Sequence, residues 1–290
     1  MCEVTIVGCG DVGSRVARAC LESGDRVVGW IRSATSLERL ASAGIPGVQV
    51  DLDEPSSPIP AVCERQLYYF APPPSTGQAD PRVARLIESF RESGSPHRVV
   101  YLSTTGVYGD CGGAWVDESW PLSPTVDRAR RRFDAETRWR VWSEESGGEL
   151  VILRVAGIYG PGKLPVKRLQ SGQPMVGEED SPITNHIHVL DLVQICRAAM
   201  QRGGNGEVYN VSDGHPGSMT GYFNQVADFL QLPRPPVISR EEAQRQLSPG
   251  MLSYLRESRR LDNRKLLSAL QIQLKYPNLA AGLPACMPNS

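Results

Sequence analysis

The sequence of 290 residues lacks several features that would indicate particular classes of protein. None of its seven cysteines stands in C-x-x-C spacing, so we expect neither a disulfide framework nor a zinc or other metal site. Lys plus Arg (31) nearly balance Asp plus Glu (32), which disfavours nucleic acid and anionic membranes as partners. Long apolar runs are missing, and a strand pattern begins at Val4, so we expect no signal peptide and no membrane span. These absences favour a cytoplasmic protein with reduced thiols.

The chain begins with an apolar strand that runs directly into a glycine-rich turn. Residues 4–7 form the strand, the glycines that follow fit G-x-G-x-x-G, and an amphipathic helix is expected over about 12–23. In such a unit Gly8 allows a tight turn, Gly10 lets the backbone approach a pyrophosphate, and Gly13 lets the helix pack on the strand. The helix N-terminus adds free N–H groups for the phosphates. The pattern predicts a dinucleotide site, and a purely structural glycine turn is the alternative.

Strands and helices alternate through the first half of the chain. Strands are expected at 26–30, 48–50, 67–70 and 98–102, with helices at 36–43 and from 81 between them. This alternation implies right-handed crossovers, so we predict an α/β fold with a Rossmann-type, doubly wound parallel sheet. Ligands of such sheets bind at the carboxyl ends of the strands. Those ends are residues 8–13, 31–33, 51–52, 71–74 and 103–108.

The second half is less regular. Helices are expected at 128–143, 189–202 and 220–230, strands at 150–155 and 207–210, and a polar helical pattern at 241–270 with a break at Pro249-Gly250. We predict that residues 1–160 form the NAD(P)-binding domain and that 161–290 form a smaller C-terminal substrate region. Residues 189–212 are expected to return to the first domain.

The end of the second strand bears on the choice of nicotinamide cofactor. NAD sites carry an acidic residue there for the ribose 2′-OH, whereas NADP sites supply an arginine for the 2′-phosphate. Here the strand is followed by Arg32 and Ser33, which can bind a phosphate. We therefore predict NADP(H), with NAD(H) as the alternative. Arg32 as an ordinary solvated arginine is the competing interpretation.

Six motifs, in order, resemble those of the short-chain dehydrogenase/reductase superfamily, and in particular its extended branch, the NAD-dependent epimerase/dehydratases of nucleotide sugars. They are Leu102–Gly109, Glu118–Pro124, Leu153–Gly162, Asn185–Asp191, Gly206–Val211 and the region from Arg259 onward. The likeness covers nearly the whole chain. The extended branch normally has G-x-x-G-x-x-G, and Val7 stands where its first glycine would be. This departure resembles the atypical members of the superfamily.

The resemblance implies roles for individual residues. Thr104 matches the catalytic Ser/Thr that binds the substrate oxygen. Asp51 and Leu52 would lie near the adenine, Ala71 and Pro72 would border the cofactor, and residues 156–158 would line the nicotinamide. With the glycine turn and the strand ends, the predicted cofactor-binding residues are Gly8, Gly10, Asp11, Val12, Gly13, Arg32, Ser33, Asp51, Leu52, Ala71, Pro72, Ser103, Arg132, Ala156 and Ile158.

The chain departs from the family at its catalytic Tyr-x-x-x-Lys pair. Alignment of the neighbouring motifs places Arg128 at the tyrosine and Arg132 at the lysine. Arg132 keeps the positive charge and a ribose contact, but Arg128 cannot exchange a proton because a guanidinium stays protonated in proteins. Tyr108, beside Thr104, is the predicted stand-in, and His186 or a bound water molecule are the alternatives.

Three residues are predicted to bind substrate. Arg128 would bind an anionic group of the substrate, and Tyr159 and His186 are the other candidates. The ring of His186 is expected to titrate near neutral pH.

These features predict an NADP(H)-binding oxidoreductase, epimerase or dehydratase. Its substrate would be a small molecule, a nucleotide sugar or another polar carbonyl or alcohol, with an anionic group as one alternative. A non-catalytic NADP-binding sensor or regulatory protein is the competing prediction, and Arg128 is the residue that favours it. A homodimer is a further expectation, because many relatives dimerise through helices that flank the active site.

Overall fold

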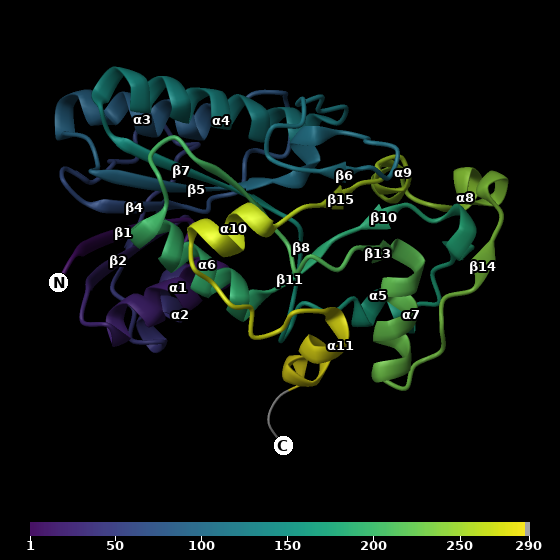
Figure 1. Cartoon of the computed structure of the whole chain (residues 1–290). Coiled ribbons are helices and arrows are strands. Elements are labelled where there is room, and N and C mark those ends of the chain that lie inside the picture. Colours follow the sequence, from purple (N-terminus) through teal and green to yellow (C-terminus); the bar gives the residue numbers. More distant parts are fainter. Residues whose placement is uncertain (288–290) are drawn as a thin grey trace.

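A seven-stranded parallel sheet forms the core of the larger of two lobes in the computed structural model, which describes residues 1–287 (Figure 1). Its strand order is β3 (Gly47–Gln49), β2 (Arg26–Ile31), β1 (Glu3–Val7), β4 (Gln66–Tyr69), β5 (Arg98–Thr104), β7 (Glu149–Val155) and β12 (Val208–Val211). The order reverses direction at β1, as in doubly wound sheets. The predicted Rossmann-type α/β fold is confirmed.

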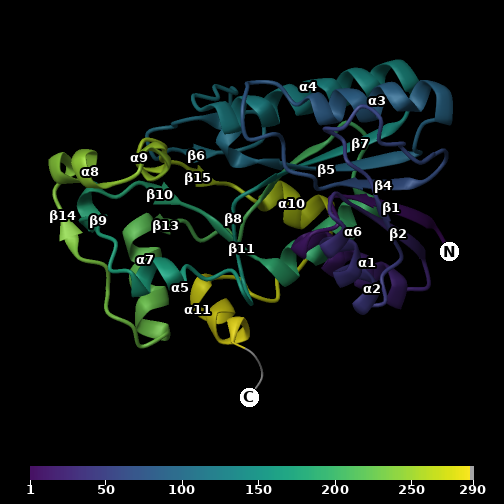
Figure 2. The ribbon, with the colours of Figure 1, turned by 180° about the vertical axis from the view of Figure 1, so that it is seen from behind.

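Helices cover both faces of this sheet because its strands carry apolar side chains on both sides (Figures 1 and 2). One face is covered by α1 (Asp11–Glu22), α2 (Ala34–Ser42) and α6 (Val189–Arg202). The other is covered by α3 (Pro81–Ser93) and α4 (Asp127–Ser146). No helix within residues 1–287 is both long enough and apolar enough to cross a lipid bilayer.

The second lobe is built from short elements. Three two-stranded pairs join β8 (Gly157–Tyr159) with β11 (His186–His188), β10 (Ile183–Thr184) with β13 (Gly217–Ser218), and β9 (Met175–Val176) with β14 (Val237–Ile238). The helices of this lobe are α5 (Val166–Gln170), α7 (Met219–Phe229), α8 (Arg240–Gln246), α9 (Pro249–Leu255) and α11 (Leu279–Gly282). Aromatic and aliphatic side chains such as Phe223 and Leu169 form its core.

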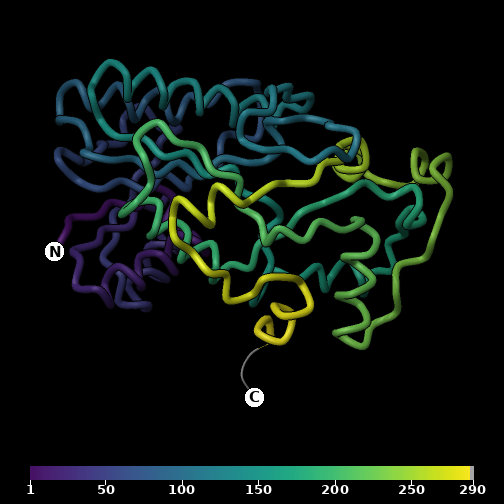
Figure 3. The backbone as a smooth tube through the Cα atoms, in the orientation of Figure 1, coloured from purple at the N-terminus to yellow at the C-terminus, as the bar shows by residue number. Residues whose placement is uncertain are grey.

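The C-terminal part of the chain passes between the two lobes, as the yellow tube in Figure 3 shows. It pairs β15 (Arg260–Leu261) with β6 (Trp115–Val116), then forms α10 (Arg264–Ala269) against the large lobe before it reaches α11. Leu266 of α10 is fully buried in the core of the large lobe. The division of the chain near residue 160 stays a prediction.

The helical run predicted over 241–270 is interrupted beside Pro249-Gly250, as expected. α8 ends at Gln246, and Pro249 begins α9, where Ser248 caps the first turn by accepting a hydrogen bond from the Met251 N–H. The prediction is wrong further along the chain. β15 then interrupts the helical pattern, because its backbone pairs with a strand far away in the chain. A local pattern does not report such a partner.

A buried ion pair connects α4 to the sheet. Glu136 of α4 accepts hydrogen bonds from Arg154 of β7, at 3.2 and 2.8 Å, and from Ser103 of β5, at 2.5 Å. Arg154 also donates to the hydroxyl of Tyr108 at 3.0 Å, which donates in turn to Oδ1 of Asn210 on β12 at 2.7 Å. The paired side chains are only 3% and 1% exposed. Every polar atom in this chain of contacts therefore has a partner, as burial requires.

Substitution of Glu136 by Ala should lower the free energy of unfolding by about 3–5 kcal/mol, because the buried Arg154 charge then has no counter-ion. The matched control is Glu144→Ala on the exposed side of the same helix, which should change stability by no more than about 0.5 kcal/mol. Urea unfolding of both variants checks this. Equal stabilities would show that the pair does not hold α4 in place.

Candidate functional site

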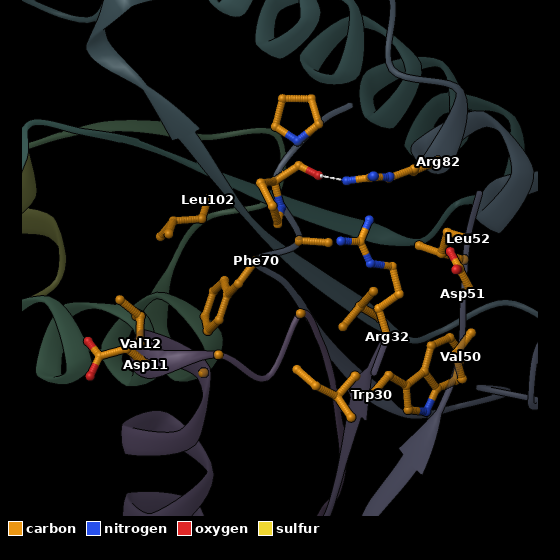
Figure 4. Close-up of a pocket in the computed structure, with 18 of the residues that line it drawn as sticks. Asp11, Val12, Trp30, Arg32, Val50, Asp51, Leu52, Phe70, Arg82 and Leu102 are labelled. Atoms are coloured by element: carbon orange, nitrogen blue, oxygen red, sulfur yellow. Dashed lines mark hydrogen bonds between the residues drawn. The ribbon is translucent and has the colours of Figure 1, made fainter. Parts of the chain in front are cut away.

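A cavity of about 590 Å³, which we call the dinucleotide cavity, lies at the carboxyl ends of the strands in the first half of the sheet (Figure 4). It is lined by most of the residues predicted to bind the cofactor. These are Gly8, Gly10, Asp11, Val12, Gly13, Arg32, Asp51, Leu52, Ala71 and Pro72. The strand-end rule therefore brings four separate sequence segments together at one site.

The glycine turn has the geometry that a pyrophosphate requires. Gly8 has a φ of 83°, and a Cβ there would lie 2.3 Å from the backbone nitrogen of Ala71, so only glycine fits. Beside Gly10 the nearest atom to an added Cβ is 4.0 Å away, which leaves open space in front of the turn. Gly10 offers no side-chain cap to α1, so the first-turn N–H groups can bind phosphate oxygens. The site fits a dinucleotide.

Two arginines from different elements meet at the adenosine end predicted for this cavity (Figure 4). Arg82 of α3 binds Asp53 at 2.6 and 2.5 Å and the carbonyl oxygen of Pro72 at 2.5 Å. Arg32 reaches the same carboxylate at 3.4 Å, and its side chain stays 66% exposed. Hydrogen bonds from Arg82 lower the pKa of Asp53, which therefore stays ionised. Arg82 is not among the predicted cofactor residues, because it reaches the cavity from a helix that carries no motif.

An ion pair crosses the glycine turn. Asp11, in the first turn of α1, binds Lys163 at 3.0 Å and Arg15 at 3.2 Å. Lys163 follows β8 and lines the dinucleotide cavity. It is not among the residues that the sequence predicted to bind the cofactor. Its charge offsets the carboxylate that would otherwise repel a pyrophosphate.

A second cavity of about 420 Å³, which we call the inter-lobe cleft, adjoins the first, and Pro73 lines both. Thr104, at the end of β5, lines this cleft and accepts a hydrogen bond from the Gly106 N–H at 3.3 Å. Ala156, which was expected near the nicotinamide, also lines it. Thr104, which was expected to match the family's catalytic Ser/Thr, thus lies in a cleft that adjoins the dinucleotide cavity.

Two arginines of α4 line the inter-lobe cleft, one helical turn apart. Arg132 donates to the carbonyl oxygen of Leu102 at 3.0 Å, beside the end of β5. Arg128 donates to Oγ of Ser253 at 2.7 Å, and its guanidinium carbon lies 4.1 Å from the centre of the Tyr254 ring.

Charged side chains give this cleft a positive balance. Arg128, Arg132 and Arg259 line it together with a single carboxylate, Glu257, which pairs with Arg259 at 2.7 Å. An anionic ligand would meet an excess of cationic groups here.

The position of Tyr108 counts against the catalytic role predicted for it. Its hydroxyl lies in the buried contacts of Arg154 and Asn210, and burial raises its pKa to about 12. It does not line the inter-lobe cleft. Ser103, predicted to bind cofactor, points to Glu136 on the other side of β5, because neighbouring side chains of a strand alternate between its faces.

The two other substrate candidates also lie outside the cleft. Tyr159 is fully buried in the second lobe, where its hydroxyl donates to the carbonyl oxygen of Asn278 at 3.2 Å. His186 stacks on Tyr222, with ring centres 4.1 Å apart, beside a separate cavity of about 350 Å³. Burial lowers its pKa to about 4, so the expectation that it titrates near neutral pH is wrong.

Two further cofactor predictions fall outside the dinucleotide cavity. The hydroxyl of Ser33 accepts a hydrogen bond from the Ser36 N–H at 3.3 Å and so caps α2. Ile158 packs against the core of the large lobe. Both positions disfavour a direct cofactor contact.

Comparisons with known proteins extend over the whole chain. A model of the NAD dependent epimerase/dehydratase family matches residues 82–212. The structure of a functionally unknown conserved protein from Silicibacter pomeroyi DSS is 32% identical, with a TM-score of 0.86, and the match covers 99% of this chain and 98% of that one. Protein YeeZ of Escherichia coli (strain K12) is 25% identical over 288 residues, which cover 96% of this chain and 97% of that protein.

The fold is also that of a UDP-glucuronic acid 4-epimerase from Bacillus cereus, whose structure is a complex with UDP-glucuronic acid and NAD. This structure is 18% identical, with a TM-score of 0.74, and the match covers 98% of this chain and 97% of that one. The family model and the fold agree with the resemblance seen in the motifs. Residues 82–212 match the NAD dependent epimerase/dehydratase family, and the whole chain shares the fold of the epimerase from Bacillus cereus.

Proposed function

We propose that this protein is an NADP(H)-dependent enzyme that reduces, epimerises or dehydrates an anionic substrate, a nucleotide sugar or a similar polar carbonyl or alcohol. The proposal rests on one observation: the dinucleotide cavity and the inter-lobe cleft adjoin each other at Pro73. The dinucleotide cavity contains the glycine turn, and the adjoining inter-lobe cleft contains Thr104 between arginines. A homodimer and a cytoplasmic location stay predictions from the sequence.

The residues at the junction have complementary tasks. When bound, a nicotinamide dinucleotide supplies or accepts the hydride of such a reaction. The hydroxyl of Thr104 binds the substrate oxygen, and Arg132 places a positive charge beside the strand end from which Thr104 projects. Arg128 and Arg259 bind the anionic part of the substrate, since each guanidinium has more N–H donors than its protein contacts use.

The preference for NADP(H) is supported by the arginine pair around Asp53. A lone carboxylate would repel a 2′-phosphate, but this one contacts both Arg32 and Arg82. Arg32 makes only one long contact and is mostly exposed, so most of its donors are free for a phosphate.

The non-catalytic alternative rests on Arg128. A protein that kept the cofactor site and lost proton transfer would bind NADPH without turning over any substrate. Purified protein should therefore be examined for bound dinucleotide and incubated with a panel of nucleoside diphosphate sugars, in both redox directions. Turnover supports the enzyme, whereas cofactor binding without turnover supports a sensor.

Replacement of Arg32 by Ala should weaken NADPH binding roughly 10- to 100-fold and leave NADH binding unchanged, because only NADPH carries the 2′-phosphate. Fluorescence titration with both cofactors measures this. Arg18→Ala, an exposed arginine on α1 outside the cavity, is the control. Equal affinity of the unaltered protein for NADPH and NADH would contradict the NADP preference.

Replacement of Thr104 by Ala should lower kcat on the order of 10²-fold while the Kd for NADPH stays the same, because the hydroxyl contacts the reacting oxygen and not the dinucleotide. Steady-state kinetics on a nucleotide sugar accepted by the unaltered enzyme give the comparison. The control is Thr137→Ala on the exposed side of α4. An unchanged kcat would remove Thr104 from the mechanism.

A further inference from the structure

We propose that Tyr254 of α9 is the proton donor and acceptor of the inter-lobe cleft, replacing the phenol that Arg128 removes from α4. The inference rests on the proposed function, since it assigns a residue to that reaction. Reduction of a carbonyl to an alcohol requires a group that gives a proton to the carbonyl oxygen. A guanidinium does not do this in proteins, so neither Arg128 nor Arg132 qualifies.

Tyr254 has the position that the reaction requires. It is the one tyrosine among the described residues that line the inter-lobe cleft, which it shares with Thr104. The residue is 50% exposed, so part of it is open to a ligand in the cleft. Its ring lies 4.1 Å from the guanidinium carbon of Arg128, the residue that the motif alignment places at the family's tyrosine. The phenol is thus supplied to the same region from a different helix.

Contacts between α9 and the start of α4 hold the tyrosine in place. Arg128 donates to Ser253, the residue next to Tyr254, at 2.7 Å. Just after α9, Glu257 accepts a hydrogen bond from Thr125 at 3.3 Å, and Arg259 donates to the carbonyl oxygen of Gly109. The segment is therefore attached on both sides of Tyr254, and the cation–π contact sets the direction of the ring.

The other titratable groups near the site are less suitable as the proton donor of the cleft. Tyr108 and Tyr159 are buried away from the cleft, and His186 belongs to another cavity. Glu257 lines the cleft, but its carboxyl group is already bound to Arg259 at 2.7 Å and to the hydroxyl of Thr125 at 3.3 Å.

In the reducing direction, the O–H bond of Tyr254 breaks as a new O–H bond forms on the carbonyl oxygen of the substrate, while the carbonyl carbon receives the hydride of the reduced dinucleotide. The products are the alcohol, the oxidised dinucleotide and a phenolate, which takes up a proton from water. Thr104 binds the same oxygen, and the nearby arginines stabilise negative charge that builds up on it.

The test is Tyr254→Phe, which keeps the ring on Arg128 and removes only the hydroxyl. With a nucleotide sugar that the unaltered enzyme converts, kcat should fall on the order of 10²-fold or more, while KM and the Kd for NADPH stay within about twofold. Tyr276→Phe, at a partly buried tyrosine that does not line the cleft, is the matched control and should keep full activity. An unchanged kcat in Tyr254→Phe overturns the inference and leaves the proposed function standing.

A second measurement tests, in the unaltered protein, whether the ligand covers Tyr254. Nitration by tetranitromethane, mapped by peptide mass spectrometry, should modify Tyr254 in the free protein because the side chain is half exposed. The same substrate together with the oxidised dinucleotide should slow this nitration at least fivefold, because the ligand covers the hydroxyl. Unprotected nitration overturns the inference. Absence of any turnover by the unaltered protein over the whole panel overturns the proposed function and this assignment together.

Discussion

The buried ion pair between Glu136 and Arg154 is the interaction on which the arrangement of the site depends. It joins α4 to β7, and its hydrogen bonds extend to Ser103 of β5 and to the hydroxyl of Tyr108. Two charges in the interior are costly to desolvate, and only a nearly complete set of partners offsets that cost. The geometry of α4 is therefore narrowly restricted. This restriction brings the arginines of α4 to the end of β5, next to Thr104.

The same buried contacts account for motifs that the sequence shares with the family. Arg154 belongs to the motif at 153–162, Tyr108 to the one at 102–109 and Asn210 to the one at 206–211. In the folded chain these three residues form one continuous set of hydrogen bonds below the cleft. Some motif residues therefore stabilise the strands beneath the site. They do not line the inter-lobe cleft themselves.

The site itself combines a glycine turn suited to a dinucleotide with an excess of positive charge in the cleft. The glycine turn and the open helix terminus provide for phosphates in general. The cleft is lined by three arginines and one carboxylate, and the ring of Tyr254 on α9 lies against Arg128 of α4. The two helices meet here because the C-terminal segment passes between the lobes.

The sequence by itself determined the α/β fold, the dinucleotide turn and most residues of the dinucleotide cavity. These follow from local periodicity, from glycine spacing and from the rule that parallel strands present their carboxyl ends at one edge. Tertiary structure alone decided the burial of Tyr108, whose partner Asn210 is 102 residues away, and the meeting of Arg128 with α9, 125 residues away. It also decided that Arg82 and Lys163 reach the dinucleotide cavity. The physical reason is that hydrogen bonds and ion pairs between side chains depend on which distant segments pack together, and such packing leaves no periodic signal in the local sequence.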